Sequence, residues 1–245
     1  MKEELKMTTE DKNYIYFDIN ELDNYKILNC SKLGSTSNIY KYKNNQIIKL
    51  FKYPESIEKL NTIEHIKKLN LKSFITPNKF IFIDEQYYGY SMDYFQAETL
   101  IDIKDNIKYL TILKNIKLID KDIETLTKNN IKINDLNFLN ILYKSKNNKL
   151  KIIDLDEYTI SNVYEKYILL SNKEEFKMDF FLSICDCFNK NINKEKINKL
   201  RKYILSDNNN DLSLYELFYN FKLYVEKIYI EEILTINDLR NVLRK

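Results

Sequence analysis

Glycine, proline and arginine are scarce in this chain of 245 residues. It contains two glycines, two prolines and no tryptophan, and its three arginines all lie at position 201 or later. Isoleucine, lysine, asparagine and tyrosine have replaced small residues and arginine almost everywhere. A glycine that remains in such a composition is more informative than usual, and a glycine that is missing from a motif counts for less.

Histidine and cysteine are too few for a structural metal site. The chain has one histidine and three cysteines, and Cys185 and Cys187 lack a second pair of ligands to complete a tetrahedral site. Because the third cysteine, Cys30, is far away in the sequence, we expect free thiols in a reducing compartment. We find no apolar secretory leader and therefore expect a cytoplasmic location.

A strong charge of one sign and a long apolar run are also lacking. Lysine plus arginine number 39 and aspartate plus glutamate 36, and this net charge of +3 is too balanced for a nucleic-acid partner. No run approaches the roughly 20 apolar residues of a membrane span. Hydrophobic residues make up 44% of the chain, with 20 Tyr and 13 Phe, which excludes a disordered chain. The length predicts one large or two small domains.

The first part of the chain has the pattern of a small sheet with one helix. Short alternating runs from 25 to 52 predict strands, and Asn44 and Asn45 predict a hairpin turn between two of them. A broad apolar face at helical spacing predicts a helix from 54 to 69. Two further strands are expected at 79–84 and 87–92.

The rest of the chain has a mainly helical pattern. Apolar residues at helical spacing predict helices at 108–129, beyond about 172, at 214–230 and from 237. Two short strands are expected between them, at 141–143 and 150–153. We therefore predict an α+β protein with an extension at 1–22 that is partly loose, a small antiparallel β lobe with one helix at 23–95 and a larger, mainly α lobe at 96–245.

Three oxygen-bearing side chains come together around the two short strands. Asp135 is followed five residues later by Asn140, and Asp154 stands at the end of the next strand, so the three are expected at one hairpin mouth. Carboxylate and amide oxygens suit Mg²⁺, which is normally shared with substrate phosphates. Upstream, Lys49 lies on a strand after a turn around Gly34, where backbone N–H groups and an ammonium can reach phosphate oxygens.

These fragments, in this order, resemble the protein-kinase fold in its divergent microbial form, that of Ser/Thr protein kinases. The catalytic loop H-R-D-L-x-x-x-N of that family maps onto the run from Ile133 to Asn140, D-F-G onto Asp154-Leu155-Asp156, and the Lys of V-A-I-K onto Lys49. The resemblance implies a bilobal kinase-like fold that uses ATP and Mg²⁺. It implies that Asp135 is the catalytic carboxylate and that Asn140 and Asp154 are metal ligands.

The resemblance also implies which residues hold the nucleotide. The glycine-rich loop keeps only its middle glycine, and Met-Asp-Tyr resembles the Met-Glu-Tyr hinge whose backbone holds adenine. Together with Lys49, the implied nucleotide-binding residues are Gly34, Ser35, Thr36, Met92, Asp93 and Tyr94.

Two carboxylates are expected to support the site. In active kinases a Glu of the small-lobe helix pairs with the anchoring Lys. The apolar register points at Thr62, with Glu58 and Glu64 flanking it, and we favour Glu64 as the partner of Lys49. The resemblance further implies that Asp179 is the buried carboxylate that braces the catalytic loop.

The departures from the family pattern leave the acceptor open. Ile133 and Asn134 replace the His and Arg of the catalytic loop, and without that Arg we do not expect control by loop phosphorylation. Few residues separate Asp154 from Asp179, which leaves little room for a peptide-docking segment. The resemblance implies phosphoryl transfer to a hydroxyl, most of all to Ser or Thr of a protein. The alternatives are a small-molecule acceptor, as in the antibiotic and choline kinases, and a nucleotide-binding pseudokinase; the oligomeric state stays open.

Overall fold

The chain divides into two compact units, which are described here one at a time. The structure is a computed structural model that describes the whole chain except residues 1–7, 29–35, 44, 105 and 245. The first unit comprises Met1–Asn70 and Ile75–Phe95, and the second comprises Leu71–Phe74 and Gln96–Lys245. The short segment 71–74 therefore packs with the helical part of the chain, although residues of the first unit flank it on both sides.

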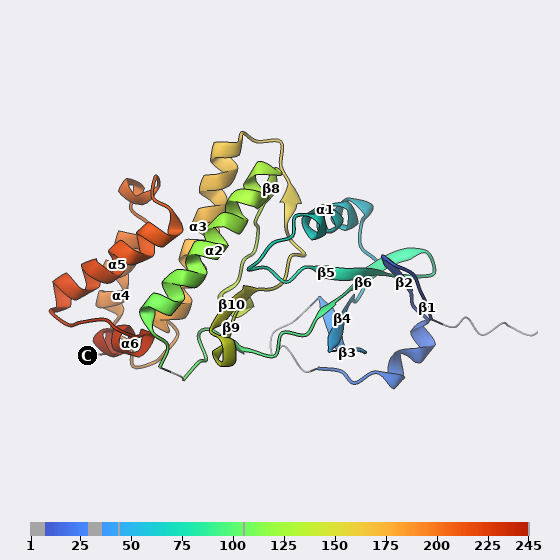
Figure 1. Ribbon diagram of the computed structural model, residues 1–245, viewed down its shortest axis with the longest axis horizontal. Helices are drawn as coiled ribbons and strands as arrows, with labels where there is room; N and C mark the ends of the chain where they lie inside the picture. The colour runs from blue at the N-terminus through green and yellow to red at the C-terminus, as the bar shows by residue number, and fades with distance from the viewer. Residues whose placement is uncertain (1–7, 29–35, 44, 105, 245) are drawn as a thin grey trace, which may run out of the picture. The chain divides into compact units, whose positions relative to one another are not determined.

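The first unit is built on a six-stranded sheet in the order β1-β2-β5-β6-β4-β3 (Figure 1). Its neighbouring strands run antiparallel, except for β2 and β5, which are parallel. The sequence predicts a strand at 25–28, but in the structure this range forms only an isolated bridge, from Ile27 to Tyr40. The strands are β1 (Thr9–Glu10), β2 (Tyr14–Tyr16), β3 (Ser37–Lys41), β4 (Gln46–Phe51), β5 (Pro77–Ile83) and β6 (Gln86–Asp93).

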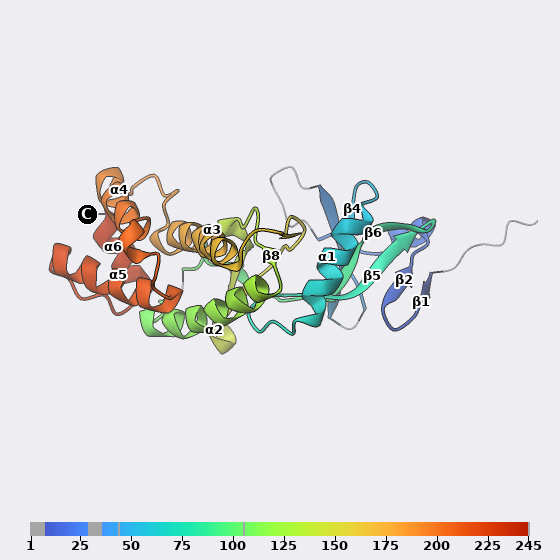
Figure 2. The ribbon, with the colours of Figure 1, turned by 90° about the horizontal axis from the view of Figure 1, so that it is seen from above.

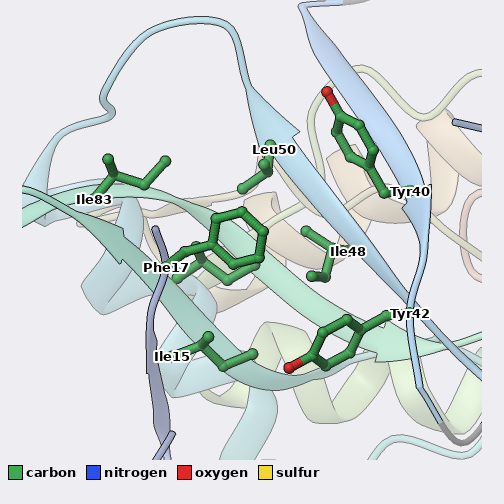
Figure 3. Close-up of a cluster of buried hydrophobic side chains, with 8 residues drawn as sticks. Ile15, Phe17, Tyr40, Tyr42, Ile48, Leu50 and Ile83 are labelled. Atoms are coloured by element: carbon green, nitrogen blue, oxygen red, sulfur yellow. The ribbon is translucent and has the colours of Figure 1, made fainter. Parts of the chain in front are cut away.

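Apolar side chains cover both faces of this sheet. On one face they pack beneath the 3-10 helix η1 (Ile19–Asn24), whose Leu22 contacts the cluster shown in Figure 3. On the other face lies α1 (Ile57–Lys68), which begins where the Ser56 hydroxyl accepts the Lys59 N–H. The buried residues of the first cluster are Ile15, Phe17, Tyr40, Tyr42, Ile48, Leu50, Ile81 and Ile83.

The second unit is mainly helical. Figures 1 and 2 show α2 and α3 running side by side, with α5 and α6 packed beside them. Buried phenylalanines join these helices, for example Phe180 of α3 and Phe218 of α5, whose ring centroids are 4.8 Å apart. The helix α3 begins before the predicted start at 172. The helices are α2 (Tyr109–Lys128), α3 (Glu165–Cys185), α4 (Lys194–Ile204), α5 (Leu214–Tyr229) and α6 (Ile236–Arg244).

Two small sheets complete the second unit. One has the strand order β10-β9-β7 and the other pairs β11 with β8. The Asn115 side chain of α2 accepts the Leu150 N–H at 2.9 Å and donates to the Asn148 carbonyl at 3.0 Å, which fixes the β9–β10 hairpin on α2. The elements are β7 (Glu98–Thr99), β8 (Ile131–Lys132), η2 (Phe138–Asn140), β9 (Ile141–Lys144), η3 (Ser145–Asn147), β10 (Lys149–Ile152), β11 (Thr159–Ile160) and η4 (Asp207–Asn209).

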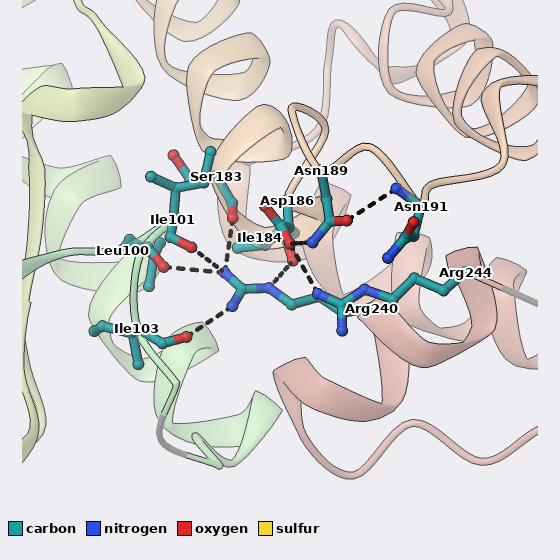
Figure 4. A network of polar contacts seen from close by, with 10 residues as sticks. All are labelled: Leu100, Ile101, Ile103, Ser183, Ile184, Asp186, Asn189, Asn191, Arg240 and Arg244. Atoms are coloured by element: carbon teal, nitrogen blue, oxygen red, sulfur yellow. Dashed lines mark hydrogen bonds and ion pairs between the residues drawn. The ribbon is translucent and has the colours of Figure 1, made fainter.

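Arg240 of α6 fastens the end of α3 to the segment that precedes α2. Its buried guanidinium donates to the carbonyls of Ile103 at 2.8 Å, Leu100 at 3.0 Å and Ser183 at 3.0 Å (Figure 4). Burial lowers the pKa of this Arg, and backbone carbonyls satisfy its donors in place of water. In this network an arginine has a structural role.

The predicted α+β class is confirmed: an antiparallel-rich sheet with one helix is followed by a mainly helical part. Among the described residues, no helix combines the length and the apolar character that crossing a bilayer requires. Each unit has an apolar core of its own, so each can fix the polar residues on its surface independently.

Candidate functional site

The loop from 133 to 140 is held at both ends by side chains of α3. The buried Asn172 accepts the Ile133 N–H at 2.7 Å and donates to the Ile131 carbonyl at 2.9 Å. Seven residues further along α3, Asp179 accepts the Phe138 N–H at 3.0 Å. Since a loop backbone has few bonds of its own, these side chains determine its conformation.

Asp135 and Asp154 have unusual backbone conformations. Their φ angles are +51° and +68°, in the left-handed region, which costs a non-glycine residue on the order of 1–3 kcal/mol. In the part of the chain that the structure describes, the other non-glycine residues with positive φ lie at hairpin turns or helix ends, where this conformation is ordinary. They are Asn45, Asn70, Asp84, Glu85, Asn130, Asn148, Asp186 and Ile230.

Asn140 and Asp154 lie next to each other at the open end of the β9–β10 hairpin. The last ladder pair is Ile141 with Ile152, and the Ile153 N–H donates to the Asn140 carbonyl at 3.0 Å, so the pairing continues for one residue. This register puts an amide side chain and a carboxylate on adjacent chain segments. Both are half-buried, and both offer the oxygen ligands that Mg²⁺ prefers.

The segment that follows Asp154 is fixed without any arginine. The Asn134 side chain donates to the Glu157 carbonyl at 2.9 Å and to the Thr159 hydroxyl at 3.0 Å. Strand β11 then pairs with β8, with Ile160 opposite Ile131. Neutral hydrogen bonds therefore hold this segment at the position where the kinase pattern has an Arg.

Negative charge accumulates beneath Asp135. Burial raises the pKa of Asp179 to about 6, and the charges of Glu175 and Asp135 add to the effect, although the bond from the Phe138 N–H opposes it. Burial also raises the pKa of Glu175; Lys132 opposes this shift, and Asp135 adds to it. Asp135 itself is exposed. The three carboxylates thus act on one another electrostatically.

In the first unit, Lys49 occupies the middle of β4 with only 5% of its surface exposed. It lies opposite Ile39 on β3 and Tyr90 on β6. The neighbouring positions Ile47 and Phe51 belong to the apolar cluster beneath α1. Because side chains alternate along a strand, Lys49 also projects from the face that α1 covers.

Gly89 allows the strand next to Lys49 to approach closely. A Cβ atom at this position would lie 2.0 Å from the Lys49 carbonyl oxygen, and the φ of Gly89 is +150°, a conformation that side chains disfavour. One of the two glycines of the chain is therefore required beside the candidate lysine. Sequence reasoning gave this glycine no role.

Both candidate glutamates of α1 accept a hydrogen bond, Glu64 through its carboxylate and Glu58 through its backbone carbonyl. The Tyr14 hydroxyl of β2 donates to Glu64 at 3.1 Å. Thr62 is buried and its hydroxyl donates to the Glu58 carbonyl at 2.9 Å, while Glu58 is exposed. The pairing of Glu64 with Lys49 stays a prediction.

The predicted phosphate-binding turn is described only in part. Gly34 and Ser35 lie outside the described residues. The Thr36 carbonyl accepts the Lys52 N–H at 2.9 Å, which fixes Thr36 at the start of β3.

The predicted adenine-binding segment follows the end of β6. Met92 is buried, and the Asp93 carboxylate accepts the Asn78 side-chain amide at 2.8 Å. The Tyr94 N–H donates to the Asn45 carbonyl at 2.9 Å, so the β3–β4 hairpin uses this donor. Adenine binding by this segment stays a prediction.

Sequence reasoning missed Asn172, although it named Asp179. The two residues are seven positions apart and share one face of α3. That spacing was a usable signal, but asparagine is so common in this chain that a single one carries little information.

The comparisons with known proteins concern the fold. No family model matches the chain, and no curated protein sequence does. The structure of the kinase PK-1 of the Cydia pomonella granulovirus matches with a TM-score of 0.56 and 18% sequence identity, over 82% of this chain and 95% of that one. The fold is protein-kinase-like. The predicted bilobal class is thereby confirmed, and activity, nucleotide and acceptor remain to be argued from the residues themselves.

Proposed function

We propose that this protein is an ATP- and Mg²⁺-dependent phosphotransferase that acts on a hydroxyl group. The observation that supports this most is the arrangement of the second unit. The hairpin register brings Asn140 next to Asp154, and the loop that carries Asp135 is fastened to α3 at both ends. Two of these three residues also have the strained backbone that clusters at functional sites.

The donor set fits a magnesium ion. Asn140 and Asp154 offer one amide and one carboxylate, and Mg²⁺ commonly takes few protein ligands beside water and phosphate oxygens. When bound, the ion would neutralise phosphate charge. Asp135, exposed at the surface, would orient the acceptor hydroxyl and take its proton. Lys49 would supply positive charge to the nucleotide phosphates.

The hydroxyl of a protein Ser or Thr is the acceptor that we expect from the resemblance. A small-molecule hydroxyl is the second candidate, because only residues 155–164 separate Asp154 from α3. Two residues of this short segment pair with β8 as strand β11. The remaining residues are few for docking a peptide.

A pseudokinase, which binds nucleotide without transferring phosphate, is the alternative from another class. Ile133 and Asn134 replace the family His and Arg, and the buried Asp156 replaces a glycine. Against this alternative, Asn134 holds the following segment by hydrogen bonds to Glu157 and Thr159. The loop is thus ordered without the missing Arg.

A transfer assay with radiolabelled ATP tests the proposal. The wild type should label an acceptor in a protein extract or a metabolite mixture, whereas Asp154→Ala and Asp135→Asn should not. The matched control Asp211→Asn, at an exposed aspartate, should keep activity. Where the label appears, on protein or on a small molecule, decides between the two acceptors.

Thermal unfolding separates binding from transfer. ATP with Mg²⁺ at a hundredfold excess over Kd should stabilise the wild type by about 2.7 kcal/mol, and Asp154→Ala should lose this effect. A shift without turnover would favour the pseudokinase. The absence of both a shift and turnover would overturn the proposal.

A further inference from the structure

The outer face of α5 carries large apolar side chains that are exposed to solvent. Tyr219, Leu223 and Ile230 are all exposed, and their spacings of four and seven residues place them in one stripe. At the start of this stripe Tyr219 stacks on Tyr215, with 6.3 Å between the ring centroids. Exposed apolar patches are typical of surfaces that bind another molecule.

Helix α2 lies beside α5, as Figures 1 and 2 show, and its first turn extends the apolar surface. The Tyr109 N–H donates to the Leu234 carbonyl at 2.8 Å, so the exposed Leu110 and Leu234 lie on adjacent chain segments. The loop that carries Leu234 is fixed, since the buried Ile233 donates its N–H to Glu226 at 2.8 Å. Both leucines are therefore exposed on an ordered backbone.

Ile230 combines exposure with an unfavourable backbone conformation. Its φ is +56°, in the left-handed region, at the C-cap of α5. This conformation is ordinary at a helix end, but glycine or asparagine normally adopts it, and it is disfavoured for a β-branched residue. Among the described residues with positive φ, four are asparagines and Ile230 is the only β-branched one. A side chain that is strained and 92% exposed gains stability if a second molecule buries it.

Positive charge lies on one side of these apolar residues. Lys114, Lys117 and Lys121 are exposed on α2 at spacings of three and four residues, on the same face as Leu110. The Lys117 ammonium lies 5.9 Å from the centre of the Tyr215 ring, which connects the lysines with the stripe of α5. Within the described residues, Lys114 and Lys121 have no ion-pair partner. Their charge is available to an acidic partner.

Negative charge lies on the other side, where the loop from α5 to α6 borders a hollow of about 480 Å³. The one basic residue of its lining, Arg244, already pairs with Asp186 at 2.8 Å. The hollow is therefore acidic, and it is large enough to receive a lysine side chain. Its lining residues are Glu231, Glu232, Asp238, Asn241 and Arg244.

The packing of α5 on α2 separates the two charged ends. Tyr215 lies beside Lys117. The Phe218 carbonyl accepts the Tyr109 hydroxyl at 3.0 Å, so α5 runs antiparallel to α2 and its C-terminal half extends beyond the start of α2, away from the lysines. The face thus has lysines at one end, apolar residues in the middle and glutamates at the other end. A two-fold axis through its middle places each acidic end on a basic end.

We propose that a second copy of this chain binds this face, in a two-fold symmetric dimer that buries Ile230. The apolar residues of the two copies cover one another, and the lysines of α2 in each copy meet the acidic loop of the other. A second copy fits better than an unrelated protein because both signs of charge lie on one face, in an order that complements itself. The inference concerns the second unit alone and does not depend on the proposed function.

Sedimentation over a concentration series tests for the dimer, at twice the monomer mass of 29.7 kDa. Ile230→Asn should weaken its Kd about a hundredfold, because two side chains are lost and each contributes about tenfold. The unfolding stability of the monomer should stay equal or rise, since asparagine suits the left-handed conformation. Leu205→Asn, at the exposed C-cap of α4, should dimerise normally. A wild type that stays monomeric up to about 100 µM, or an Ile230→Asn variant that dimerises normally, would overturn the inference.

Charge reversal tests the two-fold arrangement. One variant reverses two lysines of α2 and the other reverses both glutamates of the loop, so each should associate with itself at least about tenfold more weakly than the wild type. Mixed in equal amounts, the two should form a heterodimer, because an acidic end then meets a basic one. No heterodimer, or assemblies larger than a dimer, would overturn the arrangement. The substitutions are Lys114→Glu with Lys121→Glu, and Glu231→Lys with Glu232→Lys.

A membrane is the other occupant that a basic and apolar face can take. If the wild type stays monomeric and sediments with phosphatidylserine vesicles, and the variant with reversed lysines does not, the face binds a membrane and the inference is wrong. Lys199→Glu with Lys202→Glu, at exposed lysines of α4, is the control for the change of charge. This control should dimerise as the wild type does.

Discussion

The two units position their candidate residues by different means. In the first unit, backbone pairing places Lys49, because its position in β4 is set by hydrogen-bonded ladders with β3 and β6. In the second unit, side chains of α3 place the loop of Asp135, through Asn172 and Asp179. Many equivalent backbone hydrogen bonds hold a strand in position. Two side chains hold the loop, so the position of the loop should be far more sensitive to a single substitution.

The largest effect is expected at Asn172. Replacement by leucine keeps the side-chain size but leaves the Ile133 N–H and the Ile131 carbonyl without partners in a buried place. Since each orphaned group costs about 1–3 kcal/mol, Asn172→Leu should lower the free energy of unfolding by about 3–5 kcal/mol. Urea unfolding followed by circular dichroism measures this.

The control for this substitution is Asn198→Leu, at an exposed position of α4, which should change stability by less than about 0.5 kcal/mol. If Asn172→Leu proved as mild as the control, the loop would be held by something other than α3. The contrast between the two units would then disappear.

Gly89 tests whether the first unit has a sensitive point of its own. In Gly89→Ala the new Cβ meets the Lys49 carbonyl oxygen at 2.0 Å, so β4 and β6 must separate locally. The expected loss is about 2–4 kcal/mol, with faster amide exchange in β4 and β6 and unchanged exchange in α2 and α3. Ser91→Ala, on the same strand and buried, should be close to neutral because its hydroxyl lacks a partner among the described residues. Equal stability of the two variants would contradict the clash.

The contrast between backbone pairing and distant side-chain contacts also explains which parts of the structure the sequence could predict. Strands β4 and β6 and helix α2 follow clear apolar periods, and their residues fall on the expected elements. The parallel pairing of β2 with β5 was not predictable, because a strand as short as Tyr14–Tyr16 carries almost no period. Tertiary contacts, with Ile15 fully buried, hold it in the sheet.

For the candidate site, residue type and spacing picked out Asp135, Asn140 and Asp154, since chemistry restricts which side chains suit such positions. The same reasoning named Asp179 but not Asn172, the other side chain of α3 that contacts the loop. Asn172 acts through a backbone contact to Ile133, far away in the sequence. Its seven-residue spacing from Asp179 is a local signal, but a weak one in a chain with so many asparagines. The roles of the candidate residues remain predictions that the assays above test.

The contribution of Asp179, one of the two side chains that hold the loop of the second unit, can be measured through the pH dependence of stability. Its pKa is raised from 3.8 to about 6, so between these values the folded protein binds more protons than the unfolded chain, and stability falls as pH rises. The shift converts to at most about 3 kcal/mol, which solvent reduces to about 1–2 kcal/mol at a half-buried group. Asp179→Asn keeps an oxygen for the Phe138 N–H, so it should be more stable than the wild type by that amount at pH 7. The gain should vanish near pH 4.

Unfolding measured from pH 4 to pH 7 checks this expectation, and Asp211→Asn is the control at an exposed aspartate. If Asp179→Asn raised the free energy of unfolding by the same amount at every pH, burial would not be raising the pKa of the Asp179 carboxylate. Asp135→Asn should lower the pKa of Asp179, because the Asp135 charge contributes to the shift. Carboxyl NMR titration measures that change.

The smallest effect is expected where a side-chain bond merely supplements a ladder. Tyr14→Phe removes the hydroxyl that donates to Glu64, but the parallel pairing of Tyr14 with Phe80 and its edge-on ring contact with Phe82 remain. A loss of about 0.5–1.5 kcal/mol follows from one hydrogen bond to a charged acceptor in a partly exposed place. Tyr16→Phe, on the same strand with half of its surface exposed, should lose nothing measurable. If Tyr14→Phe cost as much as Asn172→Leu, side chains rather than strand pairing would position the first unit as well, and the difference between the two units would be one of degree.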